Sequence, residues 1–166
     1  WLGPQVKLVR AMPNTPAMIQ MGATGLYATA GVSEAEQQLA QQVMSAAGLV
    51  LWVDDEDLLH AVTAISGSAP AYFFYMLENM IATGEKLGLT QTQATALAMQ
   101  TALGSAQMAL TSHDTPAELR RKVTSPNGTT QAAIEVMDAK KMHQIIADAM
   151  LACEQRSREL SQAFGK

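Results

Sequence analysis

The sequence LVLWVDDED, residues 49–57, contains the point at which the chain changes from strands to helices. Its first five residues form a short apolar run, typical of a buried strand, and four acidic residues follow. Before it, the pattern predicts a strand, a proline-rich turn, a strand and a helix at residues 6–12, 13–16, 22–29 and 34–47. After it, helix-forming residues dominate. We therefore expect a domain boundary after residue 54, with an α/β part before it and an all-helical part after it.

Start and stop signals divide the second part into helices. A capping box, in which Ser or Thr is followed three residues later by Glu or Gln, occurs at Thr90 and Thr115, as it does at Ser33 in the first part. Ser68, with Pro70 in the first turn, is expected to be the N-cap of another helix. The predicted helices span residues 55–65, 69–87, 91–112, 116–123 and 130–163, the last with an interruption near Ala139.

Composition excludes several classes of protein. The chain has 166 residues, of which 48% are hydrophobic, and a net charge of −4, so a disordered tail or a basic nucleic-acid binder is not expected. No apolar run reaches the roughly 20 residues that span a bilayer. We expect no membrane partner and a cytoplasmic location. The single cysteine, Cys153, is interpreted as a structural thiol. Because the chain starts at Trp1, we expect it to be a piece of a longer protein.

The predicted helix at residues 91–112 is apolar around most of its circumference, with many alanines. Such a helix has to be buried on most sides, and small residues let neighbouring backbones approach closely. The helical part alone offers only a modest core, so we expect an oligomer. A self-contained helical bundle is the alternative.

Metal and hydrolase sites are not indicated. The three histidines, His60, His113 and His143, are far apart and have no partner at the spacing of a metal site. No Gly-x-Ser-x-Gly elbow is present, which disfavours a serine hydrolase. The basic cluster at residues 120–122 is interpreted as a complement to the negative end of a helix dipole rather than as a phosphate site.

The segment VTSPNGTT, residues 123–130, is the strongest candidate for a binding site. It combines hydroxyl side chains, Pro, Asn and Gly immediately before a predicted helix. The first N–H groups of a helix have no intrahelical partner, and glycine lets the backbone approach a ligand closely. Such a segment suits an anion such as a carboxylate, although an ordinary turn with an N-cap remains possible.

This segment, together with PAEL at 116–119 before it and AI at 133–134 after it, resembles the signature of the pyrroline-5-carboxylate reductase family. Three further blocks agree with the resemblance: VRAMPNTP at 9–16, TAISGSAPAY at 63–72 and RSREL at 156–160. The resemblance implies that residues 1–54 are the last part of a Rossmann-type NAD(P)-binding domain. Residues 55–166 would form an all-helical dimerisation and substrate-binding domain like the C-terminal domain of 6-phosphogluconate dehydrogenase.

The implied activity is the reduction of 1-pyrroline-5-carboxylate to L-proline by hydride transfer from NADPH or NADH. On this resemblance the substrate is held by Ser125, Asn127, Gly128, Thr129 and Thr130, and the Thr130 hydroxyl acts as catalytic proton donor or relay.

The resemblance also implies that Pro13, Asn14, Ser66 and Gly67 contribute to the cofactor site. The homodimer would bring the substrate turn of one chain to the nucleotide of another. Because the chain contains no Gly-x-Gly-x-x-Gly fingerprint, we expect it to be inactive on its own.

The chain departs from the family pattern at several positions, and two rival functions are also compatible with its sequence. Asn127 and Ala69 stand where glycine is commoner, and the basic run at 120–122 differs from the usual mixed charge. One rival is a non-catalytic oligomerisation module. Another is a different Rossmann-linked reductase, such as a β-hydroxyacid dehydrogenase, whose catalytic lysine would lie on the helix at 69–87, where only Lys86 is available.

Overall fold

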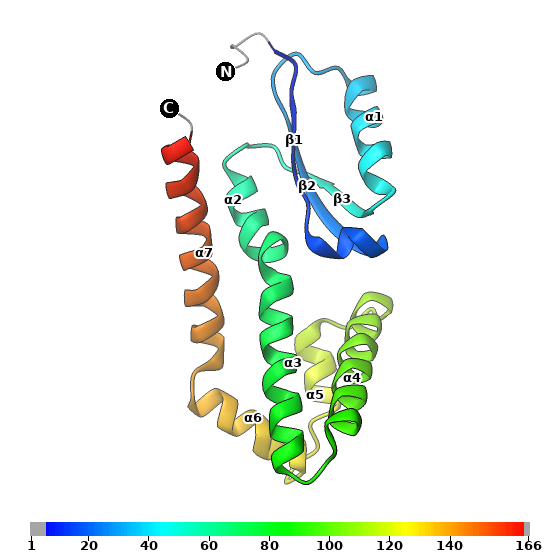
Figure 1. The fold of residues 1–166 in the computed structure, drawn as a ribbon, viewed down its shortest axis with the longest axis vertical. Helices are drawn as coiled ribbons and strands as arrows, with labels where there is room; N and C mark the ends of the chain where they lie inside the picture. The colour runs from blue at the N-terminus through cyan, green and yellow to red at the C-terminus, as the bar shows by residue number, and fades with distance from the viewer. Residues whose placement is uncertain (1–5, 165–166) are drawn as a thin grey trace. The chain divides into compact units, whose positions relative to one another are not determined.

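The computed structural model describes residues 6–164 of the chain and contains two compact units (Figure 1). The first unit runs to Tyr72 and includes the segment from Ala147 onward, and the second unit is Phe73–Ile146. The first unit contains a small sheet with its covering helices, and the second is entirely helical. A small sheet followed mainly by helices is the coarse architecture that the sequence predicts.

The sheet has three strands in the order β1-β2-β3, with β1 at Val9–Met12, β2 at Gly22–Ala28 and β3 at Gly48–Trp52. β1 pairs antiparallel with β2, and β2 pairs parallel with β3 in a register that sets Gly22 opposite Gly48. All three predicted strands are therefore confirmed, although β1 begins only at Val9. The parallel pair requires a crossover, which α1 (Glu34–Ser45) supplies.

Two glycines allow β3 to begin beside β2. Gly48 has a φ of 139°, and a Cβ at this position would lie 2.2 Å from the carbonyl oxygen of Gly22. Such a contact is impossible without moving the backbone, so only glycine fits where the helix ends and the strand starts.

The helix-start signal and the proline-rich turn predicted in the first unit are both present, and the turn is longer than predicted. Ser33 accepts a hydrogen bond from the N–H of Glu36, whose carboxylate accepts the N–H of Ser33, so the capping box of α1 is complete. The proline-rich turn after β1 continues into a short 3₁₀ helix, η1 (Thr15–Ile19).

The core of the first unit lies where α2 (Leu58–Val62) meets β2. Leu26 and Leu59 are almost completely buried. A Cβ at Gly25 would lie 2.7 Å from Val62, so the absence of a side chain lets the helix approach the strand. Figure 1 shows α1 to the right of the strands and α2 to their left.

The predicted N-cap at Ser68 is wrong. α2 does not end before α3 (Ala69–Lys86) but continues into it through a π-helical turn, η2 (Thr63–Gly67). Ser68 has helical angles, φ −92° and ψ −20°, and its N–H donates to the carbonyl oxygen of Thr63. Its hydroxyl accepts a hydrogen bond from Cys153 instead of capping a helix (3.2 Å).

The C-terminal part of α7 (Met142–Phe164) packs beside α2 in the first unit. His60 Nδ1 lies 2.8 Å from Ser157 Oγ, and Arg158 forms ion pairs with Asp57 and Glu154. The Arg158 guanidinium holds the pKa of the Asp57 carboxyl below its usual value. The interpretation of Cys153 as a structural thiol agrees with its hydrogen bond to Ser68 within this contact.

The helices of the second unit begin where the sequence predicts. α4 (Gln91–Thr111) and α5 (Pro116–Lys122) each start with a complete capping box, at Thr90 and Thr115. α3 ends at a left-handed Gly88, where the N–H groups of Gly88 and Leu89 donate to the carbonyl oxygens of Glu85 and Gly84.

The predicted interruption near Ala139 is also confirmed. α6 (Thr129–Ala139) ends there, and α7 begins at Met142 after Lys141, which has a φ of 54°.

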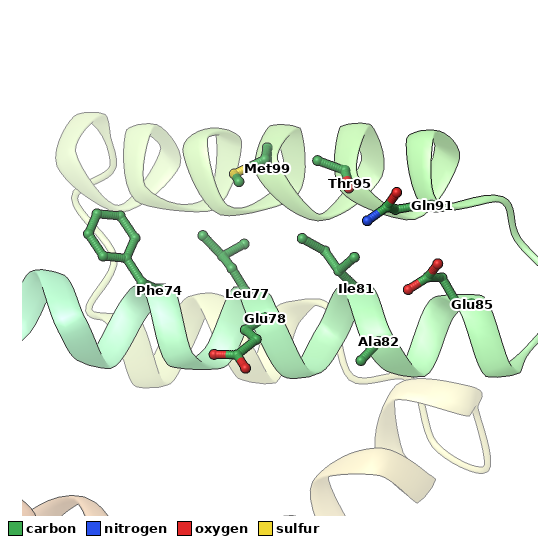
Figure 2. Close-up of a pocket in the computed structure, with 9 residues that line it drawn as sticks. All are labelled: Phe74, Leu77, Glu78, Ile81, Ala82, Glu85, Gln91, Thr95 and Met99. Carbon is green, nitrogen blue, oxygen red and sulfur yellow. The ribbon is translucent and has the colours of Figure 1, made fainter.

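α3 and α4 expose much of their apolar surface within the second unit. Of the α4 side chains, only Ala94 and Ala98 are buried, whereas Leu97, Leu103 and Leu110 are more than half exposed. A groove of about 440 Å³ runs between the two helices, and Figure 2 shows Phe74, Ile81 and Met99 among the side chains that line it.

Within residues 6–164, no helix is both long enough and apolar enough to cross a membrane.

Candidate functional site

The turn that precedes α6 has the geometry of a type II β-turn. The N–H of Gly128 donates to the carbonyl oxygen of Ser125 (3.0 Å), which closes the four-residue turn. Pro126 supplies the fixed φ that suits the second position, and Asn127 has the positive φ, 58°, that the third position requires. Asparagine is one of the few non-glycine residues that adopt this left-handed conformation readily, so the departure from glycine at 127 preserves the turn.

Gly128 forms the junction between the turn and the helix. It is the N-cap of α6, with φ −88° and ψ 170°, and no side chain caps the helix. A Cβ at this position would lie 3.0 Å from the carbonyl oxygen of Ser125, so a larger residue would press on the turn. Because its own N–H is already donated to Ser125, Gly128 contributes shape to the site rather than a hydrogen-bond donor.

Three consecutive N–H groups follow the N-cap without a partner. The first backbone bond of α6 runs from Ala132 to Gly128. In the part of the chain that the structure describes, the amides of Thr129, Thr130 and Gln131 therefore have no acceptor. They lie at the positive end of the helix dipole, equivalent to roughly half an elementary charge, so a carboxylate could accept from them without a lysine.

Two hydroxyl groups flank these amides. Ser125 is exposed and Thr130 is half-buried. Neither hydroxyl has a hydrogen-bond partner among residues 6–164, so both can turn toward a ligand.

The neighbouring basic residues are partly engaged elsewhere. Lys122 pairs with Asp114 and thereby lowers the pKa of that carboxyl. The Thr124 hydroxyl donates to the carbonyl oxygen of Arg120 at the end of α5 (2.6 Å). The first contact draws the Lys122 ammonium to the residue before the N-cap of α5, and the second fixes the path from α5 into the turn. Arg120, Arg121 and Lys122 all lie in the last turn of α5, where the interpretation as a complement to the helix dipole requires them.

A second cluster of predicted site residues lies in the first unit. Asn14 Nδ2 donates to the carbonyl oxygen of Ser66 (3.1 Å), while Asn14 Oδ1 accepts the N–H of Ala23 (2.9 Å). In a regular helix the Ser66 carbonyl would accept from residue 70, but Pro70 has no N–H. The sequence alone did not indicate this direct contact, although proline four residues after Ser66 was the available signal.

The comparison with protein families gives one decisive match. Residues 56–160 match the family model described as pyrroline-5-carboxylate reductase dimerisation. The chain belongs to the pyrroline-5-carboxylate reductase family. The resemblance inferred from the sequence is therefore confirmed.

Relatives with this name match the chain over nearly all its length. The pyrroline-5-carboxylate reductase of Pseudomonas aeruginosa is 54% identical over 166 residues, which are 100% of this chain and 61% of the relative. That of Haemophilus influenzae is 45% identical over 163 residues, covering 97% of this chain and 60% of the relative. The chain thus spans about 60% of the length of these reductases.

Solved structures of pyrroline-5-carboxylate reductases have the same fold. The enzyme from Coxiella burnetii is 44% identical and superposes with a TM-score of 0.92 over 96% of this chain and 59% of its own. The Plasmodium falciparum pyrroline carboxylate reductase, solved with NADP bound, is 26% identical, with a TM-score of 0.89 over 95% of this chain and 62% of its own.

The residues that the reductase resemblance singles out form two groups. Ser125, Asn127, Gly128, Thr129 and Thr130 all lie in the turn and the first turn of α6. Asn14 and Ser66 are hydrogen-bonded, and Pro13 and Gly67 are their chain neighbours. The groups belong to different compact units. Their roles toward substrate and cofactor stay predictions.

Sequence reasoning missed Gln131 in this candidate site. Its amide is the third unpartnered donor, and its side-chain Oε1 accepts the N–H of Asn127 (2.8 Å). A Gln at the third helical position was the available signal, because Gln at this position commonly reaches back to the residues before the helix. Among residues 6–164, no cluster of His, Cys, Asp and Glu is arranged to hold a metal ion.

Proposed function

We propose that the protein to which this chain belongs reduces 1-pyrroline-5-carboxylate to L-proline, with NADPH or NADH as hydride donor. Residues 1–54 would supply the last part of the NAD(P)-binding domain, and residues 55–166 the helical domain for dimerisation and substrate binding. The family membership and the names of the relatives support this proposal.

The observation that carries the proposal is the set of three free amides at the start of α6. A five-membered cyclic imine with a carboxylate presents one anionic group for such donors and one ring nitrogen for a hydroxyl. Charge-assisted hydrogen bonds from the amides of Thr129, Thr130 and Gln131 would contribute about 1.5–3 kcal/mol each. Thr130 would offer its hydroxyl to the ring nitrogen from the same turn of helix.

The chemistry assigned to these residues is mainly orientation. The carbon of the C=N bond becomes electrophilic when its nitrogen is protonated or accepts a hydrogen bond, so the Thr130 hydroxyl would hold or relay that proton. The bound carboxylate would fix the ring so that this carbon faces the donor at roughly 3–3.5 Å. Reduced nicotinamide, when bound, supplies the hydride. The Ser125 hydroxyl would complete the cradle around the carboxylate.

The residues of the first unit fit the nicotinamide end of a cofactor. After its bonds to Ser66 and Ala23, Asn14 still has one N–H donor and one lone pair on Oδ1. This donor and this acceptor are complementary to the C=O and NH₂ groups of a carboxamide. The Ser66 hydroxyl donates to the carbonyl oxygen of Val62 and so is left as an acceptor. Pro13 and Gly67 would shape the same end. The NADP-bound relative from Plasmodium falciparum supports the class of cofactor.

Homodimerisation through the helical domain would cover the exposed surface of α3 and α4. The family model that matches residues 56–160 is itself described as a dimerisation domain. The apolar groove between the two helices and the exposed leucines of α4 are the surface that a second copy would bury. Likeness of this domain to that of 6-phosphogluconate dehydrogenase, the absence of nucleic-acid and membrane partners, and a cytoplasmic location stay predictions.

The test is a substrate panel on the full-length protein. Oxidation of NADPH and of NADH would be followed with pyrroline-5-carboxylate and, separately, with the β-keto acids that a β-hydroxyacid dehydrogenase would reduce. We expect turnover of the cyclic imine alone. Turnover of the keto acids, or of neither class, would contradict the proposal and would favour one of the rival functions.

A further inference from the structure

The side chain of Gln131 reaches back from α6 to the turn before it. Gln131 Oε1 accepts the N–H of Asn127 (2.8 Å), and Gln131 Nε2 donates to Glu135 Oε1 (2.7 Å). The carboxylate of Glu135 can only accept, so it fixes which end of the Gln131 amide faces the turn. Gln131 is half-buried, whereas Asn127 and Glu135 are exposed.

The peptide group that Gln131 holds is the one that distinguishes two kinds of turn. Types I and II differ by a rotation of about 180° of the peptide between the second and third residues. In this turn that peptide joins Pro126 to Asn127. Proline at the second position is compatible with both types, so it does not select between them.

The hydrogen bond from the N–H of Asn127 to Gln131 selects the type II turn. It is available only when the N–H of Asn127 points toward α6, which is the orientation that accompanies the positive φ of 58° at Asn127. Asparagine adopts the left-handed conformation more readily than other residues with a Cβ, but only glycine does so without a steric cost. The Gln131 side chain therefore stabilises a conformation that the local sequence does not impose alone.

We propose that Gln131 is a positioning residue for substrate binding. By holding the peptide between Pro126 and Asn127, it keeps the turn in the form that leads Gly128 into α6 with the amides of Thr129 and Thr130 free for a carboxylate. The inference rests on the proposed function, since it concerns how the same site grips its substrate.

The test compares variants of the full-length reductase. Gln131→Met keeps the length and the helix propensity of the side chain but removes the acceptor. We expect KM for pyrroline-5-carboxylate to rise roughly 3- to 10-fold, with kcat and KM for NADPH within about twofold of the unsubstituted enzyme. Gln155→Met is the matched control, because Gln155 makes the same type of pair with a Glu four residues later, Glu159, but holds no turn.

A rescue experiment separates positioning from a general loss of stability. Glycine at position 127 adopts a positive φ at no cost, so it removes the need for the Gln131 contact. In an enzyme that already carries Asn127→Gly, Gln131→Met is therefore expected to change KM by less than about twofold relative to Asn127→Gly alone. Loss of only the Gln131–Glu135 pair would not be rescued in this way.

The outcomes are distinguishable. If the unsubstituted enzyme does not reduce pyrroline-5-carboxylate, the proposed function fails. If that enzyme is active and Gln131→Met leaves KM unchanged, the positioning role is wrong. An increase in KM of the same size when Gln131→Met is made in the Asn127→Gly background, or one that accompanies an equal increase in KM for NADPH, would also overturn the inference.

Discussion

Asn14 Nδ2 donates a hydrogen bond to the carbonyl oxygen of Ser66 (3.1 Å), a residue 52 positions later in the sequence. Through Oδ1 it also accepts the N–H of Ala23, at the start of β2. One side chain thus joins the sheet to the π-helical turn, and it satisfies the carbonyl that Pro70 cannot serve. Asn14 therefore has a structural role beside the cofactor role predicted for it.

Replacement of this side chain should lower stability. Asn14→Ala would leave a carbonyl and an amide without their partners in a half-buried setting, so we expect the free energy of unfolding to fall by about 1–3 kcal/mol. Urea denaturation followed by circular dichroism would measure it. Asn79→Ala is the control, since Asn79 donates to the Tyr75 carbonyl on an exposed helix face. Equal effects for the two variants would argue against the bridge.

The Thr130 hydroxyl should matter for chemistry more than for folding. If the full-length protein has the proposed activity, Thr130→Ala is expected to lower kcat about 10- to 1,000-fold, on the usual scale for losing one proton-relay group, with the fold retained. Thr130→Ser keeps a hydroxyl and should recover most of the rate. Steady-state kinetics with pyrroline-5-carboxylate gives both values, and an unchanged kcat for the alanine variant would remove Thr130 from the mechanism.

Gly128 should be sensitive to the addition of a single methyl group. In Gly128→Ala the new Cβ would lie 3.0 Å from the carbonyl oxygen of Ser125, so the turn must open slightly. We expect a higher KM for pyrroline-5-carboxylate in the full-length enzyme, with KM for NADPH unchanged. Isothermal titration with L-proline would give an independent measure of the same site. Equal affinity for proline in both proteins would mean that the turn tolerates the methyl group.

Acid should destabilise the first unit partly through Glu36. Hydrogen bonds from the Ser33 backbone and side chain, with a further contribution from Lys7, lower the pKa of Glu36 from 4.5 to about 2. Since the folded-state pKa lies below the unfolded one, this stabilisation is complete above about pH 4.5 and is lost as the pH falls from 4.5 toward 2.

Glu36→Gln should therefore lose stability at pH 7 and show a shallower decline between pH 5 and 2. Urea midpoints across this range measure the difference, and Glu34→Gln serves as a control in the same helical turn. Parallel pH profiles for the unsubstituted and Glu36→Gln proteins would contradict the assignment.

The 166-residue chain is expected to show no reductase activity alone. It contains no Gly-x-Gly-x-x-Gly turn to receive the pyrophosphate of a dinucleotide, so the cofactor would lack its main anchor. An assay with NADPH and pyrroline-5-carboxylate tests this expectation. Measurable turnover by the chain alone would refute it.

Local signals in the sequence predicted most of the fold. The capping boxes at Ser33, Thr90 and Thr115 located three helix starts correctly, because each depends only on residues three positions apart. The anion-suited turn was found in the same way, since Pro126 and Asn127 are turn residues by their own chemistry.

Contacts between residues far apart in the sequence were harder to predict. Ser68 looks like an N-cap beside Pro70, yet the Asn14 bridge to Ser66 and the continuous π turn replace that local preference. Gln131 was overlooked because its effect on Asn127 depends on a side-chain conformation that composition does not reveal.

The arrangement of the strands has a consequence for handling the isolated chain. β3 lies at an edge of the three-stranded sheet, and Leu49 and Leu51 on it are 59% and 60% exposed. Unpaired backbone groups beside apolar side chains act as a template on which another strand can add. Expressed by itself, this segment would promote self-association through strand addition, and a charged residue in place of Leu51 would counter that tendency.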